Sequence, residues 1–180
     1  MISETKPTVS LRQSSDADLE QIQAIYAHHV LHGLASFEEA PPSLEEMARR
    51  RADVLGKGLP HYVAAADGRV LGYAYANHYR PRSAYRYTLE DSIYIAPDAI
   101  GRGVGRRLLQ AVIDRTTELG YRQMVAVIGD SGHAASIGLH RQAGFTLIGI
   151  LPAVGFKLGR WVDSVLMQRA LGAGAQALPG

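Results

Sequence analysis

Residues 89–113 read LEDSIYIAPDAIGRGVGRRLLQAVI, and this stretch decides the fold. Its first part, Leu89 to Ile95, predicts a strand that ends before a proline. Its last part repeats apolar residues at helical spacing from Val104 to Leu119, which predicts a helix with Leu119 on its buried face. The loop Gly101-Arg102-Gly103-Val104-Gly105 joins the two elements.

A strand that feeds a glycine-rich loop and then a helix suits a phosphate ligand. Glycines let the backbone come close to the ligand, and the helix start offers unpaired N–H groups at the positive end of its dipole. Arg102, Arg106 and Arg107 add positive charge beside the loop. The Gly-Lys-Ser/Thr ending of a P-loop and the G-x-G-x-x-G spacing of a dinucleotide site are both absent. Two interpretations stay open, a tight turn shaped by glycine and a site for the pyrophosphate of coenzyme A.

The rest of the chain predicts one α/β domain over residues 1–170 and a flexible tail over 171–180. The second helix begins at Ser43, where Glu46 would complete a capping box. Asp67-Gly68 marks the turn of a hairpin. The remaining predictions are strands at Val9–Arg12, His61–Ala66, Arg69–Ala76, Met124–Ile128, Phe145–Ile150 and Val162–Ala170, and helices after Ser14-Ser15-Asp16 and over Ala134–Ala143.

Composition excludes several classes of protein. The formal net charge of +2, from 19 Lys+Arg and 17 Asp+Glu, is too balanced to indicate nucleic-acid binding. With no cysteine, the chain has no disulfide, no thiolate metal site and no cysteine nucleophile. The seven histidines form no His-x-x-x-His pair with a nearby acid, so we expect no metal. The first residues lack a signal peptide's apolar segment and no apolar run approaches about 20 residues, which predicts a cytoplasmic protein without a membrane span.

Residues 101–106 resemble the acetyl-CoA pyrophosphate loop of the GNAT superfamily. Further motifs follow in order between residues 9 and 170. Together they are similar to the phosphinothricin and methionine sulfoximine N-acetyltransferases. The resemblance implies a GNAT fold, with a mixed, mostly antiparallel sheet flanked by helices on both faces, acetyl-CoA as co-substrate, a small amine as acceptor and a homodimer. The motifs are ArgProArgSerAlaTyr (80–85), Thr88-Leu89-Glu90, Ser92-Ile93-Tyr94-Ile95, SerIleGlyLeuHis (136–140), Ala143-Gly144-Phe145 and GlyPheLysLeuGlyArgTrpValAsp (155–163).

The resemblance places the general base at Glu90. A neutral amine must attack the thioester, so a base has to remove a proton from the ammonium form of the acceptor. Burial at the end of an apolar strand would raise the pKa of Glu90 toward neutrality. Without the motif, a solvated acid at the strand end or a partner of Arg86 would be the better explanation of Glu90. Tyr85 and His140 match residues near this base in relatives, as groups that orient the acceptor or relay protons, or as packing residues.

Two arginines point to the acceptor. Arg80 and Arg82 each offer a bidentate fork for a carboxylate or phosphinate, although a solvated loop charge is the common fate of an arginine. Asp91 follows Glu90 and is expected on the opposite face of the strand, at the surface or supporting the site. The candidate substrate-binding residues are Arg80, Pro81, Arg82, Glu90, Asp91 and Ser92.

The resemblance also implies the cofactor contacts. A strand that splays from its neighbour would leave backbone groups for the pantetheine arm. Two positions depart from the family pattern, Ile100 in place of Gln or Arg, and His133 in place of Asn. Two alternatives stay open, an acetyltransferase for another amine (another amino acid, a polyamine or a protein N-terminus) and a CoA-binding sensor without activity. The implied cofactor-binding residues are Ile93, Tyr94, Ile95, Gly101, Arg102, Gly103, Val104, Gly105, Arg106, His133 and Ser136.

Overall fold

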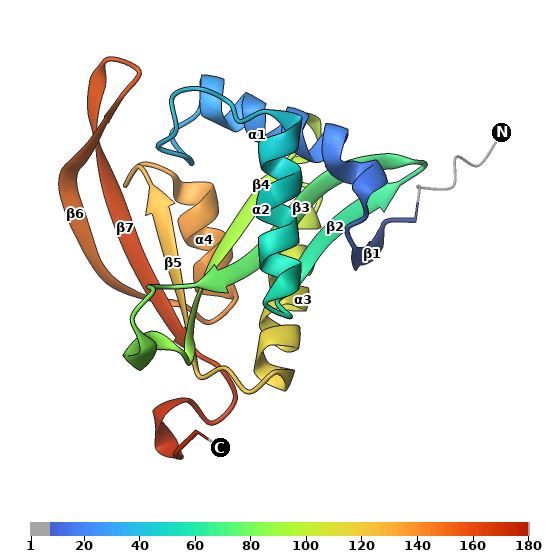
Figure 1. Cartoon of the computed structure of the whole chain (residues 1–180). Coiled ribbons are helices and arrows are strands. Elements are labelled where there is room, and N and C mark those ends of the chain that lie inside the picture. The colour runs from blue at the N-terminus through green and yellow to red at the C-terminus, as the bar shows by residue number, and fades with distance from the viewer. Residues whose placement is uncertain (1–7, 180) are drawn as a thin grey trace, which may run out of the picture.

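The computed structural model describes residues 8–179 as one seven-stranded sheet with helices on both faces (Figure 1). The strand order is β1-β2-β3-β4-β5-β7-β6, and among these strands only β4 and β5 run parallel. The predicted α/β fold with a mostly antiparallel sheet is therefore confirmed. The strands are β1 (Ser10–Gln13), β2 (His61–Ala66), β3 (Arg69–His78), β4 (Thr88–Ile95), β5 (Gln123–Gly129), β6 (Thr146–Lys157) and β7 (Arg160–Ala170); the helices are α1 (Leu19–His32), α2 (Leu44–Gly56), α3 (Val104–Glu118) and α4 (Ala134–Gln142).

Side chains of β4 alternate between two helical layers. Tyr94 packs edge-on against Tyr26 of α1, with ring centroids 4.9 Å apart. Asp91, three residues before Tyr94, points to the other face, where it contacts His140 of α4. Because alternate residues of a strand share a face, Glu90 lies on the α1 side with Tyr94. One strand thus carries the predicted base and its neighbour on opposite faces of the sheet.

Helix starts follow the predicted capping only in part. Ser43 caps α2 by accepting a hydrogen bond from the backbone N–H of Glu46 at 3.1 Å. The prediction that the Glu46 side chain would bond back to the backbone of Ser43 is wrong, because the Glu46 carboxylate binds Arg49 and Arg50 instead. α1 begins after a 3₁₀ turn, Asp16–Asp18, in which Ser15 and Asp18 form the capping box.

The predicted hairpin is confirmed around Asp67 and Gly68. Their φ angles of 50° and 76° place both residues in the left-handed region that a two-residue hairpin turn requires. α3 also forms where expected and buries its apolar face. Leu119 is an error of the prediction, because it caps the C-terminus of α3 and its side chain is 38% exposed.

The C-terminal strands differ from their predicted lengths. β6 continues past Ile150 to Lys157, and it forms a long hairpin with β7. Most of β5 is buried, but Val127 is 40% exposed. Gly174 is buried in a short 3₁₀ turn of the tail, and the Leu178 carbonyl accepts a hydrogen bond from Arg122 at 3.0 Å. The flexibility expected of this tail stays a prediction.

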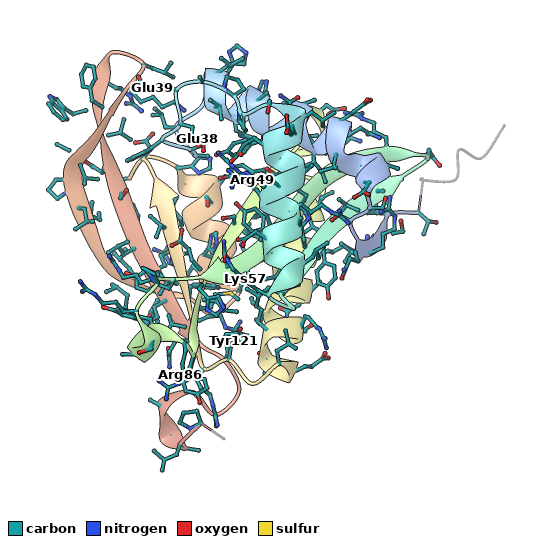
Figure 2. The ribbon with its side chains drawn as sticks, viewed as in Figure 1. Glu38, Glu39, Arg49, Lys57, Arg86 and Tyr121 are labelled. Atoms are coloured by element: carbon teal, nitrogen blue, oxygen red, sulfur yellow. The ribbon has the colours of Figure 1, made fainter. Side chains whose placement is uncertain are left out.

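The loop between α1 and α2 reaches across to β5 and β6. The buried Lys157 of β6 donates a hydrogen bond from Nζ to the Ser36 carbonyl at 2.6 Å. The Ser36 hydroxyl lies 2.8 Å from the hydroxyl of Tyr26 on α1. Glu38 and Glu39 follow in the same loop, near the end of the β6–β7 hairpin (Figure 2). These contacts hold residues 35–37 above the gap between β4 and β5.

None of the described helices is both long and apolar enough to cross a membrane.

Candidate functional site

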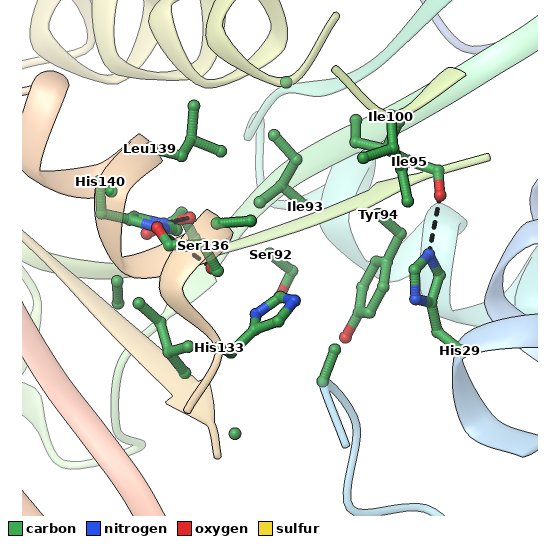
Figure 3. Close-up of a pocket in the computed structure, with 18 of the residues that line it drawn as sticks. His29, Ser92, Ile93, Tyr94, Ile95, Ile100, His133, Ser136, Leu139 and His140 are labelled. Atoms are coloured by element: carbon green, nitrogen blue, oxygen red, sulfur yellow. Dashed lines mark hydrogen bonds and ion pairs between the residues drawn. The ribbon is translucent and has the colours of Figure 1, made fainter. Parts of the chain in front are cut away.

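A cavity of about 920 Å³ opens where β4 and β5 separate (Figure 3). The two strands pair only from Thr88 to Glu90, opposite Gln123 to Val125. Beyond that point β4 stays paired with β3 and β5 with β7. The backbone of residues 93–95 therefore borders the cavity on the side that has lost its strand partner. The splay that the resemblance implies is present.

One end of the cavity is formed by the glycine-rich loop and the start of α3. Gly101 and Gly103 have φ angles of 79° and 76°, which side-chain-bearing residues rarely adopt. Gly103 is the N-cap of α3, so the first N–H groups of this helix lack intrahelical partners. The loop and the first turn line the cavity. This end offers an anion backbone donors and the positive end of a helix dipole.

The arginines of this region have different surroundings. Arg106 lines the cavity. Arg107 donates to the Val9 carbonyl at 2.9 Å and so is bound to the chain next to β1. Arg102 is exposed and is not among the lining residues. Ile100, the departure from the family pattern, lines the rim with a side chain that is 60% exposed. Arg106 is therefore the arginine best placed to meet a bound anion.

α4 forms the opposite wall. His133 is its N-cap and projects into the cavity (Figure 3), and Ser136 lines the same wall. A side chain at Gly105 would lie 3.3 Å from the Leu139 side chain, so glycine lets α3 and α4 approach closely here. The structure thus brings the predicted pyrophosphate loop and the predicted α4 residues to one cavity.

Glu90 lines this cavity and is the last residue of β4 that pairs with β5. Its side chain is half-buried. Burial raises the pKa of Glu90, the charge of Asp91 raises it further, and Arg80 opposes the shift. Its cross-strand neighbours, Asn77 and Val125, carry no charge. A carboxylate with a raised pKa beside a cavity is suited to accept a proton near neutral pH.

Asp91 is buried, so of its two predicted placements, at the surface or supporting the site, the one at the surface is wrong. It lies on the opposite face from Glu90, as expected, and its Oδ2 is 2.9 Å from Nε2 of His140. Asp91 and His140 form a buried pair behind the strand that carries Glu90.

Of the predicted acceptor residues, Glu90, Asp91 and Ser92 line the large cavity. A second, smaller cavity has a volume of about 210 Å³. Tyr85 and Tyr79 line it together with Thr88, two residues before Glu90 on β4, and Val125, the β5 partner of Glu90. The Arg80 guanidinium lies 5.0 Å from the Tyr79 ring centroid. Pro81 and Arg82 are exposed in the same loop. Tyr85 thus lines the smaller cavity and not the large one.

Comparison with known proteins decides the family. The model of the acetyltransferase (GNAT) family matches residues 23–145. The chain is a member of the GNAT family. The acetyltransferase is 61% identical over 170 residues to the phosphinothricin N-acetyltransferase of Alcaligenes faecalis, covering 94% of this chain and 86% of the relative. It is 43% identical over 162 residues to the L-methionine sulfoximine/L-methionine sulfone acetyltransferase of Pseudomonas aeruginosa, covering 89% and 94%.

A solved structure shows the same architecture. The phosphinothricin acetyltransferase of Sinorhizobium meliloti, in complex with acetyl-CoA, matches with a TM-score of 0.93 and 49% identity over 96% of this chain and 94% of that one. Membership in this family makes the protein an acetyl-CoA-dependent acetyltransferase. The glycine loop, the splayed strand and the α4 wall of the large cavity are the features that fit this co-substrate. Among the described residues, no group of three or more His, Asp or Glu side chains could hold a metal ion.

Sequence reasoning missed two parts of the acetyltransferase's cavity. His29 of α1 lines it and donates a hydrogen bond from Nε2 to the Ile95 carbonyl at 2.8 Å. No local motif marks this histidine in the sequence. Residues 35–37 line the cavity from an irregular loop that carries no helical or strand pattern. Only the contacts of this loop with β5 and β6 bring it to the site.

Proposed function

We propose that the enzyme acetylates the α-amine of a small amino-acid-like acceptor of the phosphinothricin or methionine sulfoximine type. One observation carries the proposal. Glu90, with a raised pKa, lines the large cavity. Its strand partner Val125 lines the smaller cavity, together with Tyr79, whose ring lies under the Arg80 guanidinium. A base between a thioester site and a cationic acceptor site is what this reaction requires. The two relatives named for these substrates support the choice of acceptor.

The proposed step is direct transfer. Glu90 takes a proton from the ammonium form of the acceptor, and the neutral amine nitrogen attacks the thioester carbonyl carbon. The C–N bond forms, the C–S bond breaks, and coenzyme A leaves as a thiolate that takes up a proton. The second amine proton is lost as the tetrahedral intermediate collapses, so the products are the N-acetyl compound and free coenzyme A. No cysteine is available for an acyl-enzyme, and backbone N–H groups of the splayed strand are suited to stabilise the oxyanion.

A panel assay of free coenzyme A release tests this function. Acetyl-CoA is combined with phosphinothricin, methionine sulfoximine, methionine sulfone, the standard amino acids, spermidine and short peptides. We expect saturable turnover with phosphinothricin or the sulfoximine. Turnover only with spermidine or peptides would overturn the proposed acceptor, and silence across the panel with coenzyme A still bound would favour a sensor.

Replacing Arg80 with alanine should raise KM for an acidic acceptor by roughly 10- to 100-fold, because a charge-assisted hydrogen bond to a carboxylate contributes about 1.5–3 kcal/mol. KM for acetyl-CoA should change little. Arg82→Ala is expected to act in the same direction. Steady-state kinetics with each substrate varied in turn gives both constants.

Arg86 provides the matched control. It lies in the same loop (Figure 2). Its guanidinium is 4.8 Å from the Tyr87 ring centroid, an arrangement like that of Arg80 on Tyr79. Arg86→Ala removes the same charge without removing the proposed acceptor contact. Equal changes in KM for acceptor and for acetyl-CoA in Arg80→Ala would remove that residue from the acceptor site.

We also propose that the enzyme is a homodimer that associates through the β6–β7 hairpin. β6 is an edge strand, and its hairpin exposes Phe156 and Trp161, whose side chains are 58% and 67% accessible. Val154 and Leu158 extend this apolar surface. Contiguous apolar surface of this kind marks an interaction site. Ile148 of the same strand lines the smaller cavity, so a second copy seated here would lie beside the acceptor site. The cytoplasmic location also stays a prediction.

Trp161→Glu should convert the dimer to monomers, because a buried carboxylate would lack a partner at the interface. Size-exclusion chromatography with light scattering measures the mass. Trp161→Phe keeps an aromatic ring and should remain dimeric. A wild-type enzyme that is monomeric at micromolar concentration would contradict the proposal.

A further inference from the structure

Asp91 and His140 form a buried ion pair directly behind the strand that carries Glu90. Both side chains are 3% exposed. The Asp91 Oδ2 lies 2.9 Å from His140 Nε2, whereas its Oδ1 is buried without a hydrogen-bond partner. Both residues line the large cavity. A buried carboxylate with one unsatisfied oxygen depends heavily on its single partner.

The partners of the His140 ring determine its protonation. Nδ1 lies 2.8 Å from the Ser136 carbonyl oxygen, which can only accept a hydrogen bond. Nε2 faces the Asp91 carboxylate, which also accepts. A neutral imidazole has one hydrogen and would leave a lone pair facing one of these oxygens. With Asp91 ionised, these two acceptors favour the imidazolium form of His140, which donates at both nitrogens and cannot take a proton from the acceptor.

This charge is maintained against burial. Burial lowers the pKa of His140, but the hydrogen bond and charge of Asp91 outweigh it, so the pKa is raised. His140 is also the single buried residue of α4. The ion pair thus attaches the α4 wall of the cavity to β4 and places one negative and one positive charge at different distances from Glu90.

Asp91 is adjacent to Glu90 in the chain, and His140 lies one side chain farther away. The negative charge therefore dominates, because Coulomb interactions weaken with distance. On β5, the apolar Val125 lies opposite Glu90. The other titratable or charged groups around Glu90 are Arg80 in the loop before β4, Tyr75 on β3, Lys57 bonded to Asn77, and His133 at the start of α4.

We propose that Asp91 and His140 are positioning residues with opposite effects on the ionisation of Glu90. Asp91 keeps Glu90 protonated to a higher pH, and His140 limits this effect. The inference rests on the proposed role of Glu90 as base. It assigns Asp91 to the tuning of the base and not to substrate binding. It also removes His140 from the candidates for general base.

Two neutral variants test the opposite signs. Asp91→Asn removes the negative charge, and its amide can still bond a neutral His140. The acid limb of the pH profile of kcat/KM for the acceptor should move to lower pH by about half a unit to one unit. His140→Gln keeps a donor to Asp91 but removes the positive charge, so the same limb should move to higher pH. A purely structural role would lower activity without moving the limb in opposite directions.

Asp114→Asn is the matched control. Asp114 is exposed on α3 and bonds Gln110 at 2.7 Å, far from the charge cluster, so the limb should not move. Shifts of the same sign in Asp91→Asn and His140→Gln, or no shift in either, would overturn the inference. Glu90→Gln separates the two proposals, because full activity in that variant would refute the base and not the ion pair.

Nuclear magnetic resonance of the wild-type enzyme tests the pair without any variant. Ring ¹⁵N shifts at pH 8 should show both nitrogens of His140 protonated, since exposed histidines are neutral well above their usual pKa of about 6.5. His140→Gln identifies the resonances. A neutral His140 ring at this pH would overturn the assignment of the imidazolium.

Discussion

Glu90→Gln should lower kcat at neutral pH by roughly 100- to 10,000-fold, the contribution typical of a positioned general base. Glutamine keeps the size and hydrogen-bonding capacity of the side chain but cannot take the proton. Acetyl-CoA binding should stay near the wild-type value, because the pyrophosphate end of the cavity is formed by the loop at 101–106. Stopped assays of coenzyme A release and calorimetric titration with acetyl-CoA measure the two quantities.

The loss should shrink as the pH rises, because a larger fraction of the acceptor amine is then already neutral. Glu45→Gln is the control for removing a glutamate charge, since Glu45 is exposed in the first turn of α2 and far from the cavity. It should leave kcat unchanged. Unchanged turnover in Glu90→Gln at pH 7 would remove this residue from the mechanism.

Gly129→Ala should destabilise the fold by about 3 kcal/mol, within the range that overpacking of a core reaches. A Cβ at this position would overlap the carbonyl oxygen of Leu34, and it would lie 3.1 Å from the Phe37 ring. A backbone carbonyl cannot rotate away as a side chain can. The loop at 34–37 must therefore shift, and the roof of the cavity shifts with it.

Thermal unfolding measures this effect, and a midpoint lower by about 6–12 °C is expected for a domain of this size. Gly56→Ala is the matched control. Gly56 ends α2, and a Cβ there would meet nothing within 4 Å. This control should be neutral or slightly stabilising, because alanine favours the helix. A midpoint for Gly129→Ala equal to that of Gly56→Ala would contradict the close contact.

Local patterns predicted most elements because the physics behind them is local. Asp67-Gly68 formed the expected turn, since the required φ angles depend on the two residues themselves. Ser43 capped α2 for a similar reason. Glu46 failed as the other half of that box, because two arginines one turn away compete for its carboxylate. β6 was predicted too short, because its partner β7 stabilises the strand beyond the apolar run.

The candidate site divides in the same way. Sequence motifs predicted the loop at 101–106, Glu90 and the α4 residues as parts of a site. In the structure, they line one cavity. The burial of Asp91 and its pairing with His140 join residues 49 positions apart, so no local pattern contains them. The same holds for His29 and for the loop at 35–37.

By itself, the sequence determined the family, the strand–loop–helix unit that binds an anion, and the residue types able to carry acetyl transfer. These follow from side-chain chemistry and from hydrogen bonding over a few residues. The tertiary structure alone decided where β4 leaves β5, which histidine meets Asp91, and which loop covers the opening. Those outcomes depend on contacts between distant segments. Such contacts form, and contribute to stability, only when the sheet and its helices have packed together.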